Sequence, residues 1–352
     1  EKRTIRIHIP KSFEKTENFP LILTLDGEYM FYNLIGNSEL LLATEKIPES
    51  VIVGIDQNYF DSTKIWARNN DCSYNSKNAE LKGKGIKFKE FIEKELVPYL
   101  TDKYKAGNYK VLAGHSFTAT YPNFFLFDNS VFNSYILLSP YLNERISKKI
   151  IDKLSNNNKF LSYYISTSQY DLPGHLKTVK KIDSTLNKIV FNLKTEYTFN
   201  NFKGETHYSL INRSFPFALK AIFKDYSIIT DKEIELEKNL LSYLKKKYIK
   251  INEHYGIKMP VRKDDLESIY WIAEEREDWE SLKKIGEFSI DLYPEYSDGY
   301  FMLSAVAEQN KSYKKALKLY KKGYSNLGDD VLNKKDFYRH IERLKKIIEI
   351  EK

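Results

Sequence analysis

A chain of 352 residues is too long for most single hydrophobic cores and predicts two domains of unequal size. Its net charge of +8 is spread along helical faces and mixed with glutamate, without a clustered basic segment, so nucleic-acid binding is not expected. The single cysteine, Cys72, excludes an intrachain disulfide and a zinc site built from several cysteines, and no apolar run approaches the roughly 20 residues of a membrane span.

The first residue is Glu1 rather than a methionine. We therefore expect that an upstream segment has been removed, which favours an extracytoplasmic location, periplasmic or secreted, over a cytoplasmic one. The single cysteine is compatible with either compartment.

Residues 1 to about 228 alternate short β-rich runs with helical stretches, a pattern typical of a mostly parallel sheet with helices on its faces. Apolar residues at three-to-four spacing predict helices over 86–100 and 176–188. The first two strands are joined by a polar loop and are expected to form an antiparallel edge. The predicted strands cover residues 4–9, 21–25, 50–54, 110–113, 133–138, 161–167 and 195–199.

From residue 231 to 352 strand signals nearly vanish, and apolar residues recur at helical spacing. An internal repeat with an offset of 34 residues sets Ala273, Trp279 and Ile285 against Ala307, Tyr313 and Leu319. This is the period of tetratricopeptide helix pairs and predicts a TPR-like helical domain, with a generic helical extension as the alternative. The expected domains are therefore 1–228 and 229–352, and residues 231–352 are a candidate surface for a protein partner or for self-association.

The run 110–120 places a serine between a short apolar strand and a small-residue helix start. This is the setting of a nucleophile elbow, in which Ser116 occupies a strained turn with its Oγ exposed. The Phe117 N–H would then point at the oxyanion formed when Ser116 attacks a carbonyl. The usual pattern is G-x-S-x-G, whereas this chain reads G-H-S-F-T, with Thr118 in place of the second glycine. An ordinary Gly-Ser corner is the alternative interpretation.

A serine nucleophile needs a base within hydrogen-bond reach and a group that orients this base. On this type of sheet the order along the chain is serine, acid, histidine. His207 follows the last predicted strand and precedes a long helix, which is where the base belongs. Asp171, after the strand 161–167, is the favoured acid. The alternative role for this residue is to cap the turn before Pro173. Glu205 is the alternative acid, and a Ser-His dyad is a third arrangement.

A second oxyanion donor is expected from the turn after an early strand beside the elbow. The segment Leu25-Asp26-Gly27-Glu28 supplies such a turn. Gly27 permits the sharp bend, and the Glu28 N–H is the expected donor. Asp-Gly is also an ordinary turn sequence.

At these residues the chain resembles a known family. The blocks that carry the resemblance are PLILTLDGE (20–28), VIVGI (51–55) with RNND (68–71) downstream, GHSF (114–117) and GETHYS (204–209). They look like successive blocks of the putative-esterase family of α/β hydrolases, which includes esterase D, feruloyl and acetylxylan esterases and the esterases of catecholate siderophores. The siderophore-esterase branch is the most similar, and some of its members carry a helical C-terminal extension.

The resemblance covers residues 1 to about 226 and implies an α/β-hydrolase fold with ester hydrolysis by Ser116 and His207, without a metal or cofactor. It does not decide the acid, because resemblance to the siderophore-esterase branch is also compatible with a dyad. Arg68 matches a family arginine near the mouth of the site, where it could grip an anionic or catecholate substrate. The alternative is a surface arginine paired with Asp71.

The sequence therefore predicts a serine esterase in which Ser116 attacks an ester carbonyl and His207 takes and returns the proton. Two alternatives stay open: a scaffold or protein-interaction protein that works through the helical repeats, and an acyltransferase that uses the same residues. Several aromatic residues would line an acyl or aryl pocket, unless they are core: Tyr29, Phe31, Tyr32, Tyr59, Phe60 and Trp66.

Overall fold

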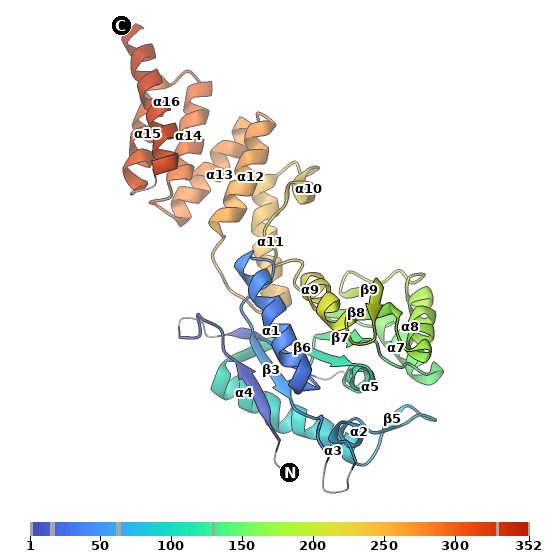
Figure 1. The fold of residues 1–352 in the computed structure, drawn as a ribbon. Coiled ribbons are helices and arrows are strands. Elements are labelled where there is room, and N and C mark those ends of the chain that lie inside the picture. Colours follow the sequence, from blue (N-terminus) through green and yellow to red (C-terminus); the bar gives the residue numbers. More distant parts are fainter. Residues whose placement is uncertain (1–2, 15–17, 61–64, 129–130, 329–330, 351–352) are drawn as a thin grey trace. The chain divides into compact units, whose positions relative to one another are not determined.

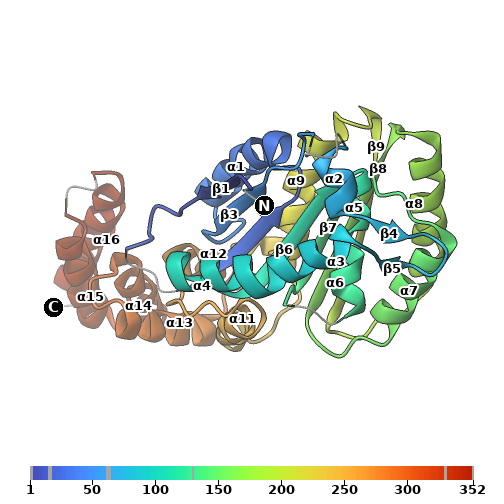
Figure 2. The same ribbon diagram turned by 90° about the horizontal axis from the view of Figure 1, so that it is seen from below.

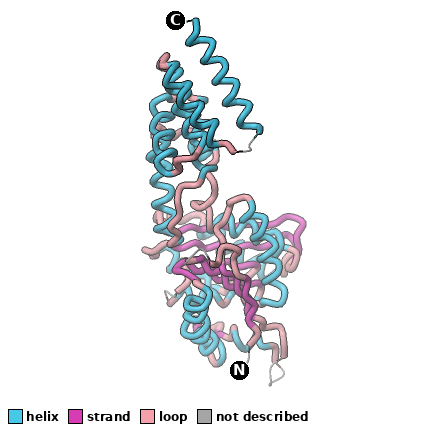
Figure 3. Tube along the Cα trace, turned by 90° about the vertical axis from the view of Figure 1, so that its left-hand side faces the viewer, coloured by secondary structure: helices cyan, strands magenta, loops and turns pink. Residues whose placement is uncertain are grey.

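The computed structural model describes residues 3–14, 18–60, 65–128, 131–328 and 331–350. The chain divides into two compact units, one made of Glu1–Ser227 with Glu253–Ile257 and the other of Ile228–Asn252 with Lys258–Lys352. Among the described residues, strands occur in the first unit alone, and the second unit is helical (Figure 1; Figure 3).

A seven-stranded sheet forms the centre of the first unit, in the order β1-β3-β2-β6-β7-β8-β9. Every neighbouring pair is parallel except β1 with β3. The mostly parallel sheet predicted from the sequence is confirmed, and β6, β8 and β9 extend beyond their predicted ranges. The strands are β1 (Ile5–His8), β2 (Phe19–Thr24), β3 (Val51–Ile55), β6 (Ala106–His115), β7 (Ser134–Leu138), β8 (Leu161–Tyr170) and β9 (Thr195–Thr206).

The pairing expected for the first strand is wrong. β1 is an antiparallel edge strand, but its neighbour is β3, with Ile5 opposite Ile55. β2 is parallel to a strand on each side, namely β3 and β6. All six residues of β2 are buried, whereas every residue of β1 is only partly buried. This burial is typical of a central strand and an edge strand, respectively.

Helices cover both faces of the sheet (Figure 2). On one face α1 (Gly27–Ala43) packs against α9 (Leu210–Ile222). The other face shares a core with alternate strand residues such as Leu21 and Leu23, because side chains along a strand alternate between faces. Its helical segments are α3 (Lys84–Glu90), the π-helical η1 (Phe91–Leu96), α4 (Val97–Tyr104), α6 (Pro122–Phe127), α7 (Glu144–Ser155) and α8 (Pro173–Leu186).

The segment between β3 and α3 carries the remaining small elements of the first unit. They are a short helix, α2 (Ala67–Asp71), and an antiparallel pair of two-residue strands, β4 (Tyr74–Asn75) and β5 (Glu80–Leu81). The helix α2 contains Arg68 and begins directly after Trp66, so it determines where both side chains lie.

Residues 253–257 belong to the first unit although they lie far along the chain. The Tyr255 hydroxyl donates to the Ile222 carbonyl oxygen at 2.9 Å, and its ring centroid lies 4.9 Å from that of Tyr109. The Gly256 carbonyl oxygen accepts a hydrogen bond from Asn18 at 3.0 Å. Tyr255 is buried, so this segment completes the packing around Tyr109.

From α12 onward, each helix of the second unit packs against the next one. α12 and α14 begin at residues 263 and 297, and α13 and α15 begin at 279 and 313, so each pair recurs after 34 residues. None of the described helices combines the length and apolarity that a membrane crossing requires. The helices are α10 (Asp231–Ile234), α11 (Leu240–Tyr255), α12 (Lys263–Glu275), α13 (Trp279–Leu292), α14 (Ser297–Gln309), α15 (Tyr313–Asn326) and α16 (Val331–Ile350).

Candidate active site

Ser116 lies in the sharp turn between β6 and α5 (Phe117–Thr120), at the carboxyl end of a central strand. Its backbone has φ 61° and ψ −123°, a conformation that residues other than glycine rarely adopt. The Ser116 N–H donates to the Leu138 carbonyl oxygen at 2.8 Å, which helps to hold this strained backbone. A Cβ on Gly114 would lie 2.6 Å from the Thr118 carbonyl oxygen, so only glycine fits there. This is the backbone geometry that a nucleophile elbow requires.

Three polar side chains form a continuous hydrogen-bonded line at this end of the sheet. His207 Nε2 lies 2.9 Å from Ser116 Oγ, and His207 Nδ1 lies 2.6 Å from Asp171 Oδ1. The serine follows β6, the aspartate follows β8 and the histidine follows β9. Because these strands are parallel, their carboxyl ends meet at one edge of the sheet and bring the three residues together.

The Asp171 carboxylate is buried and well supplied with donors. Ser139 Oγ and the Leu172 N–H each donate to its Oδ1 at 2.8 Å, and Thr167 Oγ1 donates to Oδ2 at 2.6 Å. Burial raises the pKa of this carboxyl, but the hydrogen bonds from His207, Thr167 and Ser139 outweigh burial and lower the pKa to about 2. Asp171 is therefore ionised at neutral pH and can accept the proton on His207 Nδ1 in a hydrogen bond.

Glu205, the alternative acid, faces Arg213 rather than His207. Its Oε1 is 3.7 Å from Arg213 Nε. No hydrogen bond joins Glu205 to His207 in the part of the chain that the structure describes. Of the two candidate acids, the structure brings only Asp171 to the imidazole.

His115, inside the elbow, contacts the backbone of His207. Its Nε2 lies 2.8 Å from the His207 carbonyl oxygen and its Nδ1 lies 3.1 Å from the Tyr29 hydroxyl. Burial, together with the nearby His207, lowers the pKa of His115 to about 3. The neutral ring donates its single N–H from Nε2 to the His207 backbone. This contact cannot be predicted from the sequence, because the two histidines are 92 residues apart.

Asp26, expected from the sequence only as part of a turn, is buried beside the elbow and accepts several hydrogen bonds. Its Oδ2 accepts hydrogen bonds from Thr118 Oγ1 at 2.7 Å, Arg68 Nη2 at 2.9 Å and the Tyr29 hydroxyl at 2.9 Å. Asn58 Nδ2 donates to its Oδ1 at 3.1 Å. Burial raises the pKa of the Asp26 carboxyl, and the positive charge of Arg68 opposes this shift. No signal in the sequence alone distinguishes this residue from an ordinary Asp-Gly turn.

The two predicted oxyanion donors open helices at the carboxyl ends of neighbouring strands. Glu28 lies in the first turn of α1, after β2, and Phe117 begins α5, after β6. The first N–H groups of a helix have no partner inside the helix. A Cβ on Gly27 would lie 2.7 Å from Asp56 Oδ1, so the bend needs glycine. The Glu28 carboxylate accepts the Asn58 N–H at 2.6 Å.

Arg68 does not pair with Asp71, which corrects that alternative. Asp71 accepts two hydrogen bonds from Arg3, at 2.5 and 2.6 Å. Arg68 Nη2 instead donates to Asp26 and lies 3.3 Å from the His115 carbonyl oxygen. Arg68 Nε is buried and has no hydrogen-bond partner among the described residues. The guanidinium therefore lies next to the turn that carries Ser116.

The aromatic residues expected to line a pocket divide between core and surface. Phe31, on α1, is buried and belongs to the core. It packs closely on Gly54, where an added Cβ would lie 3.0 Å from the Phe31 Cβ. Trp66 and Phe60 are exposed, with ring centroids 4.6 Å apart. Tyr208, which was not among the aromatic residues predicted to line a pocket, is 68% exposed, and its ring centroid lies 5.2 Å from that of His207.

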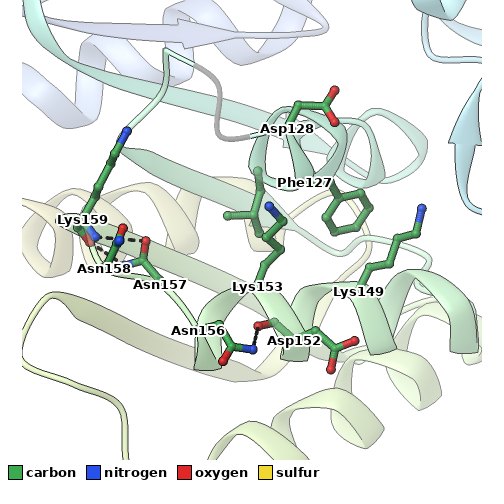
Figure 4. Close-up of a pocket in the computed structure, with 10 residues that line it drawn as sticks. Phe127, Asp128, Lys149, Asp152, Lys153, Asn156, Asn157, Asn158 and Lys159 are labelled. Atoms are coloured by element: carbon green, nitrogen blue, oxygen red, sulfur yellow. Dashed lines mark hydrogen bonds between the residues drawn. The ribbon is translucent and has the colours of Figure 1, made fainter.

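A separate pocket of about 610 Å³ lies at the ends of the strands opposite to Ser116 (Figure 4). Asp128 precedes β7 and Lys159 precedes β8, so the pocket adjoins the amino ends of the strands, whereas Ser116 follows a carboxyl end. Lys149 and Lys153 extend from α7 toward it. Among the described residues, no group of three or more His, Cys, Asp or Glu side chains is arranged to hold a metal ion.

The fold and the serine turn together define an α/β hydrolase. Residues 1–211 of the 352 match the sequence family described as "Putative esterase". The chain therefore belongs to this family, and it is a carboxylic-ester hydrolase with a helical C-terminal region. The resemblance stated from the sequence is confirmed.

Solved structures show the same fold. An uncharacterised protein of Capnocytophaga ochracea is 23% identical with a TM-score of 0.79, over 98% of this chain and 96% of that one. An IroE-like serine hydrolase of Shewanella oneidensis is 21% identical with a TM-score of 0.58, over 78% and 90%. The BES protein of Bacillus cereus is 21% identical with a TM-score of 0.54, over 64% and 89%. No curated protein matches the sequence.

Proposed function

We propose that this protein hydrolyses esters through Ser116, His207 and Asp171. The observation that carries the proposal is the line of hydrogen bonds from Ser116 Oγ to His207 Nε2 at 2.9 Å and from His207 Nδ1 to Asp171 Oδ1 at 2.6 Å. In this arrangement the serine hydroxyl has a base within reach, and the base has an ionised partner that fixes its tautomer.

The reaction follows from these positions. Ser116 Oγ attacks the ester carbonyl carbon while His207 Nε2 takes the hydroxyl proton, and Asp171 stabilises the imidazolium that forms. The Phe117 and Glu28 N–H groups hold the oxyanion. His207 then gives its proton to the leaving alcohol oxygen, and a water molecule repeats both steps to release the acid and restore Ser116.

For the substrate we propose an aryl or acyl ester of the kind cleaved by the siderophore-esterase branch. Exposed aromatic rings support this choice, since Tyr208 stands beside His207 and Trp66 precedes the helix that carries Arg68. Aromatic rings can stack on a catechol or feruloyl group. An acyltransferase would use the same three residues, and an added alcohol acceptor would then appear in the product.

The test measures hydrolysis of p-nitrophenyl butyrate, a feruloyl ester and a catecholate ester. Ser116→Ala and His207→Ala are each expected to lower kcat by at least about 10³-fold, because loss of either residue abolishes the action of the whole set of catalytic residues. Ser155→Ala, at an exposed position in α7, is the matched control and keeps the wild-type rate. A Ser116→Ala variant as active as the wild type would overturn the assignment.

For residues 231–352 we propose a docking role toward a protein partner. The observation that favours it is a pocket of about 710 Å³ whose lining residues all come from α12 to α16. The test is capture of a defined ligand by the full chain, because cutting the chain at residue 228 would also remove Tyr255 from the first unit.

A further inference from the structure

The pocket of the helical unit has an aromatic floor. The Phe301 ring centroid lies 5.2 Å from that of Tyr320 and 5.1 Å from that of Phe337, so α14, α15 and α16 meet there. Tyr270 of α12 continues this floor, with its centroid 6.5 Å from that of Phe301. Trp271 is different, since it lines the same pocket but is 55% exposed.

The two arginines that line this pocket are already paired within it. Arg343 Nη2 lies 2.5 Å from Glu308 Oε2 and 3.0 Å from His340 Nδ1. Arg339 Nη2 lies 3.4 Å from Asp336 Oδ1. These groups therefore leave little positive charge to attract an anionic ligand.

Two carboxylates on α12 are not neutralised in this way. Glu267 Oε1 accepts a hydrogen bond from Trp271 Nε1 at 3.3 Å. Burial and the negative charge of Glu274 raise the pKa of Tyr270, the residue that continues the aromatic floor. Neither glutamate has an ion pair within the described part of the chain. The indole donor is neutral, so the α12 wall of the pocket keeps its negative charge.

The spacing of these residues makes one binding edge. Glu267, Trp271 and Glu274 are separated by four and three positions, which places them along one face of the helix. An exposed indole face attracts a guanidinium or ammonium group, and carboxylates on either side add to this attraction. The bond from the indole N–H to Glu267 also fixes the orientation of the ring.

We propose that Glu267, Trp271 and Glu274 bind an arginine or lysine side chain of a partner peptide in this pocket. This inference rests on the docking role proposed for the helical unit and names its ligand chemistry. The whole chain carries a net charge of +8, which disfavours general attraction of a cationic peptide. Binding of such a peptide therefore requires a local negative site of this kind.

The experiment measures the fluorescence anisotropy of a labelled peptide, Gly-Arg-Gly-Ser-Arg-Gly-Ser-Arg-Gly, with the full chain at physiological salt. The wild type binds it and does not bind the same peptide with glutamate at the arginine positions. Combined Glu267→Gln and Glu274→Gln substitutions weaken binding by about tenfold or more, and Trp271→Leu alone weakens it by about fivefold, since the first change removes two contacts to the cation and the second removes one. Glu280→Gln, on an exposed glutamate paired with Lys284 in α13, leaves the affinity unchanged.

Each other outcome counts against the proposal. Absence of binding by the wild type, or equal binding of both peptides, would show that the α12 carboxylates do not select a cationic side chain. Binding that the α12 variants do not weaken places the peptide elsewhere, while the docking role itself survives. Sedimentation that shows a dimer lost in the same variants makes a second copy of the chain the occupant. Hydrolysis of p-nitrophenyl butyrate by every variant reports on the first unit, so failure of the esterase proposal would be seen separately.

Discussion

Thr118 Oγ1 lies 2.7 Å from Asp26 Oδ2, and this hydrogen bond joins the elbow to the turn that opens α1. The same hydroxyl accepts the His115 N–H at 3.1 Å. Each of the two turns carries one proposed oxyanion donor, Phe117 in the first and Glu28 in the second. A glycine at position 118, as in the usual motif, could not make this connection.

Replacing Thr118 by valine keeps the shape of the side chain and removes the hydroxyl. We expect kcat to fall by about ten- to a hundredfold with little change in KM, because a lost buried hydrogen bond to a charged group is worth about 1.5–3 kcal/mol and the donors then shift. Thr118→Ser retains the hydroxyl and should restore most of kcat. Steady-state kinetics on p-nitrophenyl butyrate provide the measurement, and a wild-type kcat in the valine variant would contradict the role.

The choice of acid is tested by two isosteric substitutions. Asp171→Asn should lower kcat by about 10³- to 10⁴-fold, because the amide favours the wrong tautomer of His207. Glu205→Gln should remain near wild type, since Glu205 faces Arg213. Comparison of the two kcat values decides the matter, and near-normal rates in both would favour a dyad.

Buried His115 predicts a pH-dependent stability. Its pKa falls from 6.5 to about 3 on folding, so the unfolded chain binds the proton first. Stability from this group is complete above about pH 6.5 and is lost progressively as the pH falls toward 3. His115→Gln places an uncharged donor near the Nε2 position, and its melting temperature should fall less steeply between pH 7 and 4, an interval framed by these two pKa values. Equal slopes in thermal melts of both proteins would rule out this linkage.

Two glycines should respond to alanine in opposite directions. Gly114→Ala brings a Cβ against the Thr118 backbone and is expected to cost about 3 kcal/mol or more, or to prevent folding. Gly36 lies inside α1 with no atom near the position of a Cβ, so Gly36→Ala should stabilise by about 0.5–1 kcal/mol. Thermal unfolding compares them, and a tolerated Gly114→Ala would mean that the elbow relaxes.

The sequence was most informative where the pattern is local. The strands appear as short apolar runs, and the order serine, acid, histidine pointed to Ser116, Asp171 and His207, which the structure places in hydrogen-bond contact. The partner of β1 could not be predicted, because pairing depends on which strand is left at the edge once β2 and β3 are buried.

The contacts among the residues around the elbow were beyond the reach of sequence patterns for a related reason, although Arg68 itself was expected near the site. Asp26, Arg68 and Thr118 come from three separate blocks and acquire their roles only where these blocks converge. The same holds for His115, whose partner is the His207 backbone. A carboxylate in a turn and a histidine after a glycine look ordinary until their neighbours in space are known.

The return of Tyr255 to the first unit has a practical consequence for dissecting this protein. A fragment that ends at Ser227 would expose the rings of Tyr109 and Phe223, which Tyr255 covers at centroid distances of 4.9 and 5.4 Å. Such a fragment is expected to aggregate, whereas one that extends through Ile257 keeps the cover. No single cleavage of the backbone therefore yields the esterase unit intact without also taking α10 and α11 with it.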